Sequence, residues 1–436
     1  MKKNGFIMST YVYILLVFFL LLLGTMLVVL NNTRLLANKI KENTDGNIDF
    51  NLVLKGDKEI FIVKDSEYIE PGCIATTFDG EKLEVRVMGE ANAKKSGEYD
   101  IEYSAEYKGV EKKVKRKVIV GENLVTYITN LYEDSITRAS NNLKKDNTED
   151  KNIRYYGANP NNYVRFNNEL WRIIGIFGNN VKLIRNDRLG WLSWDTSEST
   201  VNSGYGINQW GESKDTSGNI YEGADLQVYL NKMYYGGIEV TCYNDLNNTK
   251  TTCPKDSNGN FLELDDVAKN LIDNHTWNIG AMRYISRTNT LTFYQAERGS
   301  VHGKSSCSSG NRCNDTIIRT TEWTGYVGLP YVTDWAYASS EGICETNMAT
   351  QDSSNNYICK NNNWMQKSIL AWYLLPVTTS SGACYAWYVN KTGDPAGNYT
   401  YGLGGVIPAV YLKSDVFVTG GLGTSDNPYK LWLSEN

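Results

Sequence analysis

The chain has 436 residues, of which 41% are hydrophobic and 21% are charged, so its composition excludes wholesale disorder, collagen-like structure and a membrane protein with many spans. Its 44 Lys and Arg against 49 Asp and Glu give a net charge of -5, without the basic excess that binding to nucleic acid requires. The length predicts two or three domains, and 30 Tyr, 11 Trp and only 2 His favour a β-rich extracytoplasmic binding surface over an acid/base enzyme.

The clearest feature of the sequence is an uncharged run rich in Leu, Val and Phe at residues 11–30. Its length is the roughly 20 residues that a helix needs to cross a membrane. Lys2 and Lys3 precede the run, so we expect residues 1–10 in the cytoplasm, residues 31–47 as a juxtamembrane helix, and the rest outside the cell. A cleaved signal peptide is the alternative, but no small-x-small cleavage site follows the run closely.

The first residues, from Lys3 through Gly5 and Phe6 to Ile7, resemble the start of type IV prepilins, in which a basic leader ends at Gly and the mature helix begins at Phe. Pilins typically have Glu as the fifth mature residue, where this chain has Thr10. The resemblance implies, as an alternative, a minor pilin-like subunit in a pilus-type assembly.

Residues 48–121 have the pattern of an all-β sandwich, with turn signals at Asp-Gly, Ser-Gly and Lys-Gly pairs. Short β-like runs lie at residues 60–63, 83–87, 99–103 and 114–120. The basic residues from Lys112 to Lys117, Arg116 among them, alternate with valines. This alternation favours a strand with one solvated face over a patch that binds polyanions.

The order of motifs in this region is similar to that of bacterial immunoglobulin-like surface domains. The matching residues are 68–72, Ala75, Asp79 with Gly80, 96–103 and 118–120. The resemblance implies a stalk or spacer and brings no catalytic residues.

Residues 122–155 are expected to form a helical linker. Ile128, Leu131 and Ile136 follow a helical spacing, and the charged stretch at residues 144–151 has the composition of a solvated hinge.

Residues 156–436 are expected to form an α+β domain that opens with a β-hairpin turning at Asn167 and Asn168. Further strands are expected at residues 181–185, 383–389 and 405–412, and helices at residues 226–233 and 264–272. The rest reads as loops. The predicted fold class is therefore multidomain: a transmembrane helix, an immunoglobulin-like sandwich and a final α+β domain.

The last 280 residues or so resemble a family of uncharacterised bacterial surface domains related to the C-type-lectin-like fold, a group that includes formylglycine-generating enzymes. The motifs that carry the resemblance are residues 163–166, 170–175, 182–187, 226–231, 296–299, 323–329 and 405–412. Relatives usually have Arg where this chain has Ile407, so any contact of that Arg is lost here. The resemblance implies a lectin-like head and leaves a secreted enzyme of the formylglycine-generating group as an alternative.

Six cysteines lie in pairs within loop-rich regions, which predicts three local disulfides on the outer side of a membrane. The pairs are Cys242 with Cys253, Cys307 with Cys313, and Cys344 with Cys359. Cys73 and Cys384 stand apart and are expected to be buried thiols.

No catalytic residue, metal ligand or cofactor site is predicted. His275 and His302 are the two histidines, and Asp273 lies too close to His275 in sequence to predict a triad orienter. His302 with Cys307 and Cys313 does not match the spacing of a structural zinc site.

Exposed aromatic residues beside Asn, Asp and Gln would suit a carbohydrate or protein ligand. Trp191, Trp194, Tyr205 and Trp210 lie in a loop of this composition and are the ligand-binding candidates. The alternative is that these tryptophans fill the core beneath the loops. The sequence therefore predicts a single-pass membrane protein whose lectin-like head binds an extracellular protein or carbohydrate.

Overall fold

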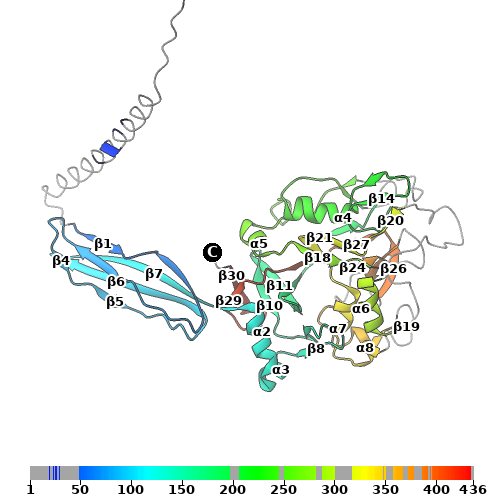
Figure 1. Cartoon of the computed structure of the whole chain (residues 1–436), viewed down its shortest axis with the longest axis horizontal. Coiled ribbons are helices and arrows are strands. Elements are labelled where there is room, and N and C mark those ends of the chain that lie inside the picture. Colours follow the sequence, from blue (N-terminus) through cyan, green and yellow to red (C-terminus); the bar gives the residue numbers. More distant parts are fainter. Residues whose placement is uncertain are drawn as a thin grey trace, which may run out of the picture. The chain divides into compact units, whose positions relative to one another are not determined.

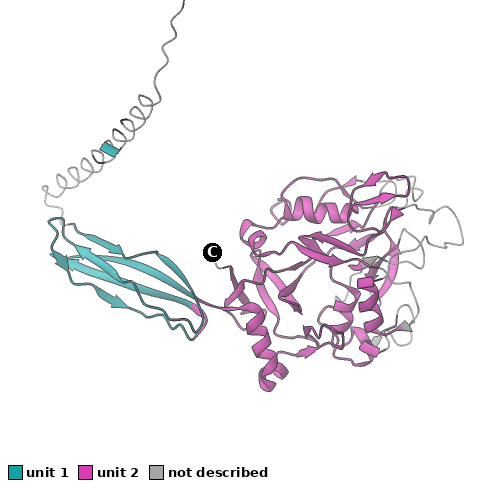
Figure 2. Cartoon of the chain, in the orientation of Figure 1, with its two compact units in different colours: residues 1–94, 98–119 teal, residues 95–97, 120–436 magenta. Residues whose placement is uncertain are grey.

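The computed structural model describes most of the chain beyond residue 48, together with Phe19, Leu23, Thr25, Met26 and Val29. The described ranges are 49–196, 206–244, 250–280, 287–299, 317–346, 348–349, 357–366, 372–377, 385–390, 393 and 395–433. The chain divides into two compact units (Figures 1 and 2). Unit 1 comprises Met1–Lys94 and Glu98–Ile119, and unit 2 comprises Lys95–Gly97 and Val120–Asn436.

The predicted membrane helix at residues 11–30 lies outside the described residues except for those five positions, which are helical. Residues 1–10 and 31–47 also lie outside them. Within the described part of the chain, no helix has the length and apolar character needed to span a membrane.

Unit 1 contains two sheets, and its buried apolar side chains form two clusters. The first sheet joins β1 (Asn51–Leu54), β3 (Cys73–Thr76) and β4 (Lys82–Leu83), and the second joins β2 (Glu59–Val63), β7 (Val110–Asn123), β6 (Gly97–Tyr107) and β5 (Arg86–Met88). Ile101, Tyr103 and Val118 are buried between them. The predicted β-sandwich is therefore present, with β1 and β3 in addition to the strands expected from the sequence.

The basic strand β7 has one solvated face, as expected. Lys113 and Lys115 are half exposed, and their ammonium groups lie 3.5 and 3.4 Å from the carboxylate of Glu102. Arg116 differs from the expectation, because it is fully buried and pairs with Glu70 while its Nε donates to the carbonyl oxygen of Asp57 at 2.9 Å. Arg116 therefore does not belong to the solvated face of β7, because it points into the sandwich and is paired there with Glu70.

Unit 2 begins with the helices α2 (Leu124–Glu133) and α3 (Ser135–Ser140), which are capped by the side chains of Asn123 and Asp134. The strands β8 (Leu143–Lys145) and β9 (Ile153–Tyr155) follow and pair with each other. The loop between them is not a solvated hinge, because Asp146 and Thr148 in it are 3% and 0% exposed. Arg154 in β9 holds Asp146 in the interior, which composition alone does not reveal.

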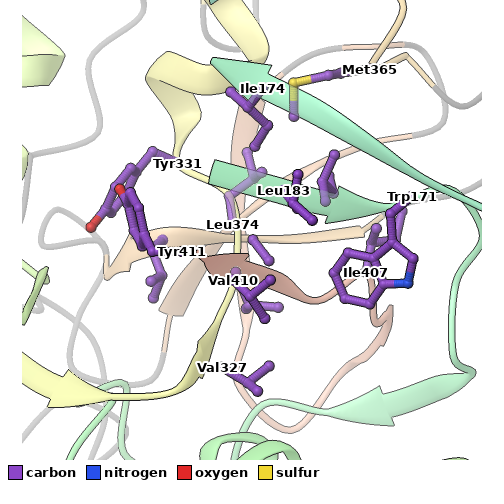
Figure 3. Packing of buried hydrophobic residues seen from close by; sticks show 14 of the residues in the cluster. Trp171, Ile174, Leu183, Val327, Tyr331, Met365, Leu374, Ile407, Val410 and Tyr411 are labelled. Carbon is purple, nitrogen blue, oxygen red and sulfur yellow. The ribbon is translucent and has the colours of Figure 1, made fainter. Parts of the chain in front are cut away.

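The main sheet of unit 2 has the strand order β22-β28-β12-β11-β10-β30-β29, and the end of β7 pairs with β29. Its strands are β22 (Val327–Gly328), β28 (Ala409–Tyr411), β12 (Asn180–Arg185), β11 (Glu169–Phe177), β10 (Tyr163–Phe166), β30 (Tyr429–Leu433) and β29 (Val416–Gly420). The β10–β11 hairpin turns at Asn167 and Asn168, whose φ angles of 53° and 58° are those of a type I′ turn. Apolar side chains of β11, β12 and β28 meet in the core (Figure 3).

A second sheet has the order β13-β27-β24-β25-β26. It is built from β13 (Trp191–Ser193), β27 (Leu403–Gly405), β24 (Trp372–Val377), β25 (Tyr385–Val389) and β26 (Pro395–Tyr399). Four small sheets complete the strands: β14 (Ser213–Asp215) with β15 (Ile220–Tyr221) and β20 (Ile317–Ile318), β16 (Cys242–Tyr243) with β17 (Lys250–Thr251), β18 (His275–Asn278) with β21 (Glu322–Gly325), and β19 (Arg287–Thr288) with β23 (Met348–Ala349).

Short helices cover parts of these sheets. They are α4 (Asp225–Val228) continued by the π-helix η2 (Tyr229–Tyr235), α5 (Asp266–Leu271), α6 (Thr290–Gly299), α7 (Val332–Tyr337), α8 (Ile343–Thr346) and α9 (Tyr357–Lys360). The α4–η2 segment and α5 lie at the two helices that the sequence predicts. Unit 2 is thus β-rich with short helices, and its relation to the C-type-lectin-like fold stays a prediction.

Candidate functional site

The predicted aromatic binding loop is divided between the surface and the core. Trp191 in β13 is 37% exposed, whereas Trp194 and Trp210 are 0% exposed. Tyr205 lies outside the described residues. A fully buried ring cannot stack on a ligand, so the binding role predicted for Trp194 and Trp210 was wrong.

Trp194 and Trp210 belong to the core because they pack on each other, with ring centroids 5.0 Å apart. Trp210 also meets Trp323 edge to face at 6.0 Å. The backbone N–H of Trp194 donates to the carbonyl oxygen of Thr400 at 2.8 Å, which fixes the start of the loop. The alternative prediction, that these tryptophans fill the core beneath the loops, therefore holds for this pair.

Trp191 is the one predicted candidate that the described structure leaves at the surface. The guanidinium carbon of Arg188 lies 4.9 Å from its ring centroid, within the range of a cation–π contact. Trp191 pairs with Gly405 of β27, and the nearby Leu403 of the same strand is 46% exposed. This part of the second sheet therefore exposes an aromatic ring and an apolar side chain, with the partly buried Arg188 against the ring.

Two of the three predicted disulfides are present. Cys242 is bonded to Cys253, which ties β16 to the loop after β17, and Cys344 is bonded to Cys359, which ties α8 to α9. Cys307, Cys313 and Cys384 lie outside the described residues. Cys73 has a free thiol that is partly rather than fully buried.

We expect peptide mapping without reductant to recover Cys242 linked to Cys253 and Cys344 linked to Cys359. Each bond closes a loop of 11 or 15 residues, so its removal should lower the free energy of unfolding by about 2–3 kcal/mol. Alkylation of all four thiols in protein purified from its host without reductant would contradict the pairing. Cys73 serves as the internal control, because its thiol should react once the chain is unfolded.

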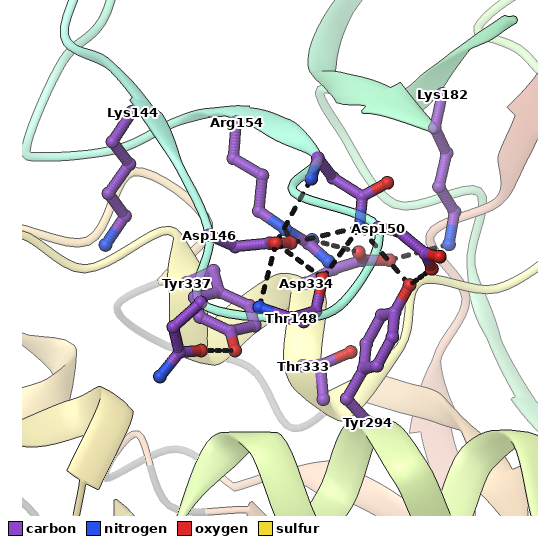
Figure 4. Close-up of polar contacts among 12 residues, drawn as sticks. Lys144, Asp146, Thr148, Asp150, Arg154, Lys182, Tyr294, Thr333, Asp334 and Tyr337 are labelled. Atoms are coloured by element: carbon purple, nitrogen blue, oxygen red, sulfur yellow. Dashed lines mark hydrogen bonds and ion pairs between the residues drawn. The ribbon is translucent and has the colours of Figure 1, made fainter. Parts of the chain in front are cut away.

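The strongest polar feature of unit 2 is a buried ionic cluster, which we define as Asp146, Arg154, Lys182 and Asp334 (Figure 4). Arg154 bridges the two carboxylates, with Nε 2.6 Å from Asp146 Oδ2 and Nη1 2.8 Å from Asp334 Oδ1. Nζ of Lys182 lies 2.6 Å from Asp334 Oδ2. All four side chains are at most 1% exposed, so two cations neutralise two anions away from water.

Local structure holds both carboxylates in place. Asp146 accepts hydrogen bonds from the backbone N–H groups of Thr148 and Asn152, at 3.2 and 3.1 Å, and so closes the loop between β8 and β9. Asp334 lies in the first turn of α7 and accepts from the backbone N–H of Tyr331 at 2.9 Å. A carboxylate at a helix N-terminus is favoured by the helix dipole.

The pKa shifts in the ionic cluster follow from this arrangement. Burial alone would raise the pKa of Asp334, but Lys182 and Arg154 hold it below the ordinary value. Burial lowers the pKa of Lys182 to about 8, against the opposing influence of Asp334. Burial also opposes the charge on Arg154, but Asp146 and Asp334 together raise its pKa above the ordinary value.

Glu297 in α6 is a further fully buried carboxyl group next to the ionic cluster. It accepts hydrogen bonds from Thr333 Oγ1 at 2.8 Å and from Arg298 Nη1 at 3.2 Å. Burial raises the pKa of Glu297 to about 7, although Arg298 lowers it. A raised pKa means that the folded protein holds this proton at pH values where the unfolded chain has lost it.

We expect this group to make unit 2 less stable as the pH rises from about 4.5 to about 7, by on the order of 2–3 kcal/mol. Below the ordinary pKa of 4.5 both states are protonated and the stability is fully present. Glu297→Gln should flatten this dependence, as measured by urea unfolding across the pH range. An unchanged slope in the variant would show that Glu297 does not carry it.

His275 and Asp273 form a pair that the sequence interpretation missed. Nδ1 of His275 lies 3.0 Å from Oδ2 of Asp273, and the imidazole stacks on Tyr411 with centroids 3.7 Å apart. The signal was the spacing itself, because residues i and i+2 of an extended segment lie on the same side. Burial lowers the pKa of His275 against the effect of Asp273, which favours a neutral ring near pH 7. His302 lies outside the described residues.

Metal ligands do not gather in the described ranges, where His, Cys, Asp and Glu form no group of three or more that could hold an ion. The described geometry offers a histidine–aspartate pair, a neutralised ionic cluster and an exposed aromatic surface at Trp191.

Comparison with known proteins assigns part of the chain. Residues 52–120 match the family model of the bacterial surface protein Ig-like domain. The match coincides with the β-sandwich of unit 1 and agrees with the resemblance seen in the sequence. The comparison with curated proteins finds no match.

Solved structures give only weak similarity. A lipoprotein from Bacteroides thetaiotaomicron is 29% identical over 17% of this chain and 39% of that chain, with a TM-score of 0.16. The CBM51-2 and INT domains of ZmpB from Clostridium perfringens are 13% identical over 39% of this chain and 38% of theirs, with a TM-score of 0.14. The chain thus spans well under half the length of either protein.

Proposed function

We propose that the chain is a membrane-anchored bacterial surface protein in which unit 1 is a spacer and unit 2 binds an extracellular protein or carbohydrate. The observation that carries the proposal is the match of residues 52–120 to a bacterial surface Ig-like domain. The two disulfides of unit 2 support it, because such bonds persist mainly outside the reducing cytoplasm.

In this proposal the apolar run at residues 11–30 anchors the chain, with residues 1–10 in the cytoplasm and both units outside. The charge pattern supports this direction, because Lys2 and Lys3 precede the run. The buried Arg116 of unit 1 is paired with Glu70, which is consistent with a structural rather than a binding role for this cation in a spacer.

We expect protease treatment of intact cells to remove both units and to leave a small membrane-bound fragment. Antibodies against unit 2 would follow its loss, and a cytoplasmic protein would control for lysis. Survival of unit 2 on cells whose other surface proteins are digested would refute the outward orientation. A mature N-terminus at Phe6 would instead favour the pilin-like alternative.

Ligand binding in unit 2 is proposed to use the surface around Trp191 without catalysis. An exposed tryptophan beside Arg188 is the kind of residue that dominates binding surfaces. Screening the purified chain against glycans and surface proteins would identify a ligand. Trp191→Ala should then weaken binding by about 1–3 kcal/mol while leaving the fold intact. Unchanged affinity in that variant would place the ligand elsewhere, and turnover of any ligand would refute the absence of catalysis.

A further inference from the structure

The proposed binding role makes no use of the contact between Lys182 and Asp334. Nζ of Lys182 lies 2.6 Å from Oδ2 of Asp334, and both side chains are 0% exposed. Lys182 comes from β12 and Asp334 from α7, 152 positions later in the chain. We propose that these two side chains condense to an amide, so that an isopeptide bond joins Nζ of Lys182 to Cγ of Asp334 in the mature protein.

The packing holds the two groups as reactants. A contact of this length between groups fixed on a strand and a helix replaces a bimolecular encounter by an intramolecular one, with a large gain in effective concentration. The backbone N–H of Tyr331 donates to Asp334 Oδ2 at 2.9 Å and prevents the carboxyl group from turning away. The amine and the carboxyl carbon therefore need only a small approach to form a bond.

The surroundings of Lys182 favour the nucleophilic form of its amine. Nζ lies 3.8 Å from the ring centroid of Tyr331 and 5.1 Å from those of Trp277 and Tyr411. The rings close the side chain off from water, and this burial lowers the pKa of Lys182 to about 8 against the opposing effect of Asp334, so the neutral amine is more accessible than in water. An amine reacts with a carbonyl carbon only when its nitrogen has a free electron pair.

The surroundings of Asp334 stabilise the charge that the reaction develops. Nη1 of Arg154 donates to Asp334 Oδ1 at 2.8 Å, and this oxygen becomes the oxyanion when Nζ adds to Cγ. Thr333, the neighbour of Asp334, holds the carboxyl group of Glu297 through its hydroxyl at 2.8 Å. Glu297 thus provides a buried group near the pair that can take up and return a proton.

The condensation balances without a further reactant. One proton first passes from the ammonium group to the carboxylate, giving an amine and a carboxylic acid. Nζ then attacks Cγ, the C–N bond forms, and the bond from Cγ to Oδ2 breaks. Oδ2 leaves as one water with the two protons that Nζ loses, while Oδ1 stays as the amide oxygen. A buried ion pair, whose desolvation is costly, becomes a neutral amide.

Peptide mapping of the full-length protein tests the proposal directly. After reduction, alkylation and tryptic digestion, mass spectrometry should recover the peptides of Lys182 and Asp334 as one branched species. Its mass should be the sum of the two peptides less one water, and trypsin should not cleave after Lys182. Two separate linear peptides, with cleavage after Lys182, would overturn the proposal.

Two controls make the result specific. Lys115 lies 3.4 Å from Glu102 but is 58% exposed, so this pair should stay unlinked in the same digest. Lys182→Arg retains a cation beside Asp334 and removes the nucleophilic amine, so the intact mass of the variant should agree with its sequence without the loss of one water. A folded Lys182→Arg protein, verified by near-UV circular dichroism, that still lacks one water would overturn the assignment to Lys182.

Discussion

Replacing Arg154 by Met is expected to lower the free energy of unfolding of unit 2 by about 3–5 kcal/mol. Arg154 is the cation shared by Asp146 and Asp334, and all three side chains are at most 1% exposed. The substitution keeps an apolar side chain of similar length but leaves Asp146 with no cation among the contacts of the ionic cluster. The cost of an uncompensated buried charge, rather than lost packing, sets the size of the effect.

Lys232→Met is the matched control, because it also exchanges a cation for Met in unit 2. Lys232 lies 3.0 Å from Glu222, but the two side chains are 52% and 75% exposed, so the loss should stay below about 1 kcal/mol. Urea unfolding followed by tryptophan fluorescence measures both variants. Equal, small losses of unfolding free energy in the two variants would show that burial does not increase the contribution of the ionic cluster to stability.

Acid should destabilise the unaltered protein for the same reason, because protonation removes the charge with which Arg154 pairs. The pKa of Asp146 is held below the ordinary 3.8 in the folded state by Arg154, against the effect of burial. The stability that Asp146 contributes is therefore present above pH 3.8 and is lost as the pH falls through its folded pKa. In Arg154→Met the cation that lowers the pKa of Asp146 is gone, so the loss of stability in acid should shrink or reverse, because protonation then removes an uncompensated buried charge.

The sequence predicted those regular elements that have a local signal. The alternation of residues 99–103 and 114–120 predicted β6 and β7, and the Asn-Asn turn predicted the β10–β11 hairpin. The apolar spacing before Gly236 predicted the helix that the structure divides into α4 and η2. Hydrophobic periodicity and turn residues involve neighbours in sequence, so they can be recognised in a single sequence.

Long-range contacts explain what the sequence interpretation missed. Residues 144–151 look solvated because they are charged, and only the partner Arg154 shows why Asp146 is buried. The helices α6 and α7 lie in a region read as loops. All six residues of α7 are buried, so its sequence shows no one-sided apolar pattern that would predict a helix. Polar composition predicts exposure only where no distant partner neutralises the charge.

Local sequence also could not show which of the aromatic candidates are buried by long-range contacts. Trp191, Trp194 and Trp210 share one composition of flanking residues, so the sequence alone could not separate a surface ring from two core rings. Their separation depends on sheet pairing: β13 places Leu192 inside and Trp191 outside, and the chain then turns Trp194 toward Trp210. A buried tryptophan and an exposed tryptophan can therefore have the same kinds of neighbours in sequence.

Trp210→Ala is therefore expected to destabilise unit 2 by about 3–5 kcal/mol, whereas Trp191→Ala should cost less than about 1 kcal/mol. The Trp210 ring is 0% exposed and packs on Trp194 and Trp323, so its removal leaves a cavity that the neighbouring rings cannot fill. Trp191 is 37% exposed and its loss creates no such cavity.

Thermal and urea unfolding of the two variants, each with both disulfides intact, measures the difference directly. Binding to a ligand found by screening gives the complementary measurement, since Trp210→Ala should leave the affinity of its folded fraction unchanged while Trp191→Ala weakens it. The reverse pattern, a stable Trp210→Ala protein with lost binding, would mean that the Trp210 ring reaches the surface when the ligand binds. It would then restore the binding role first predicted for the loop.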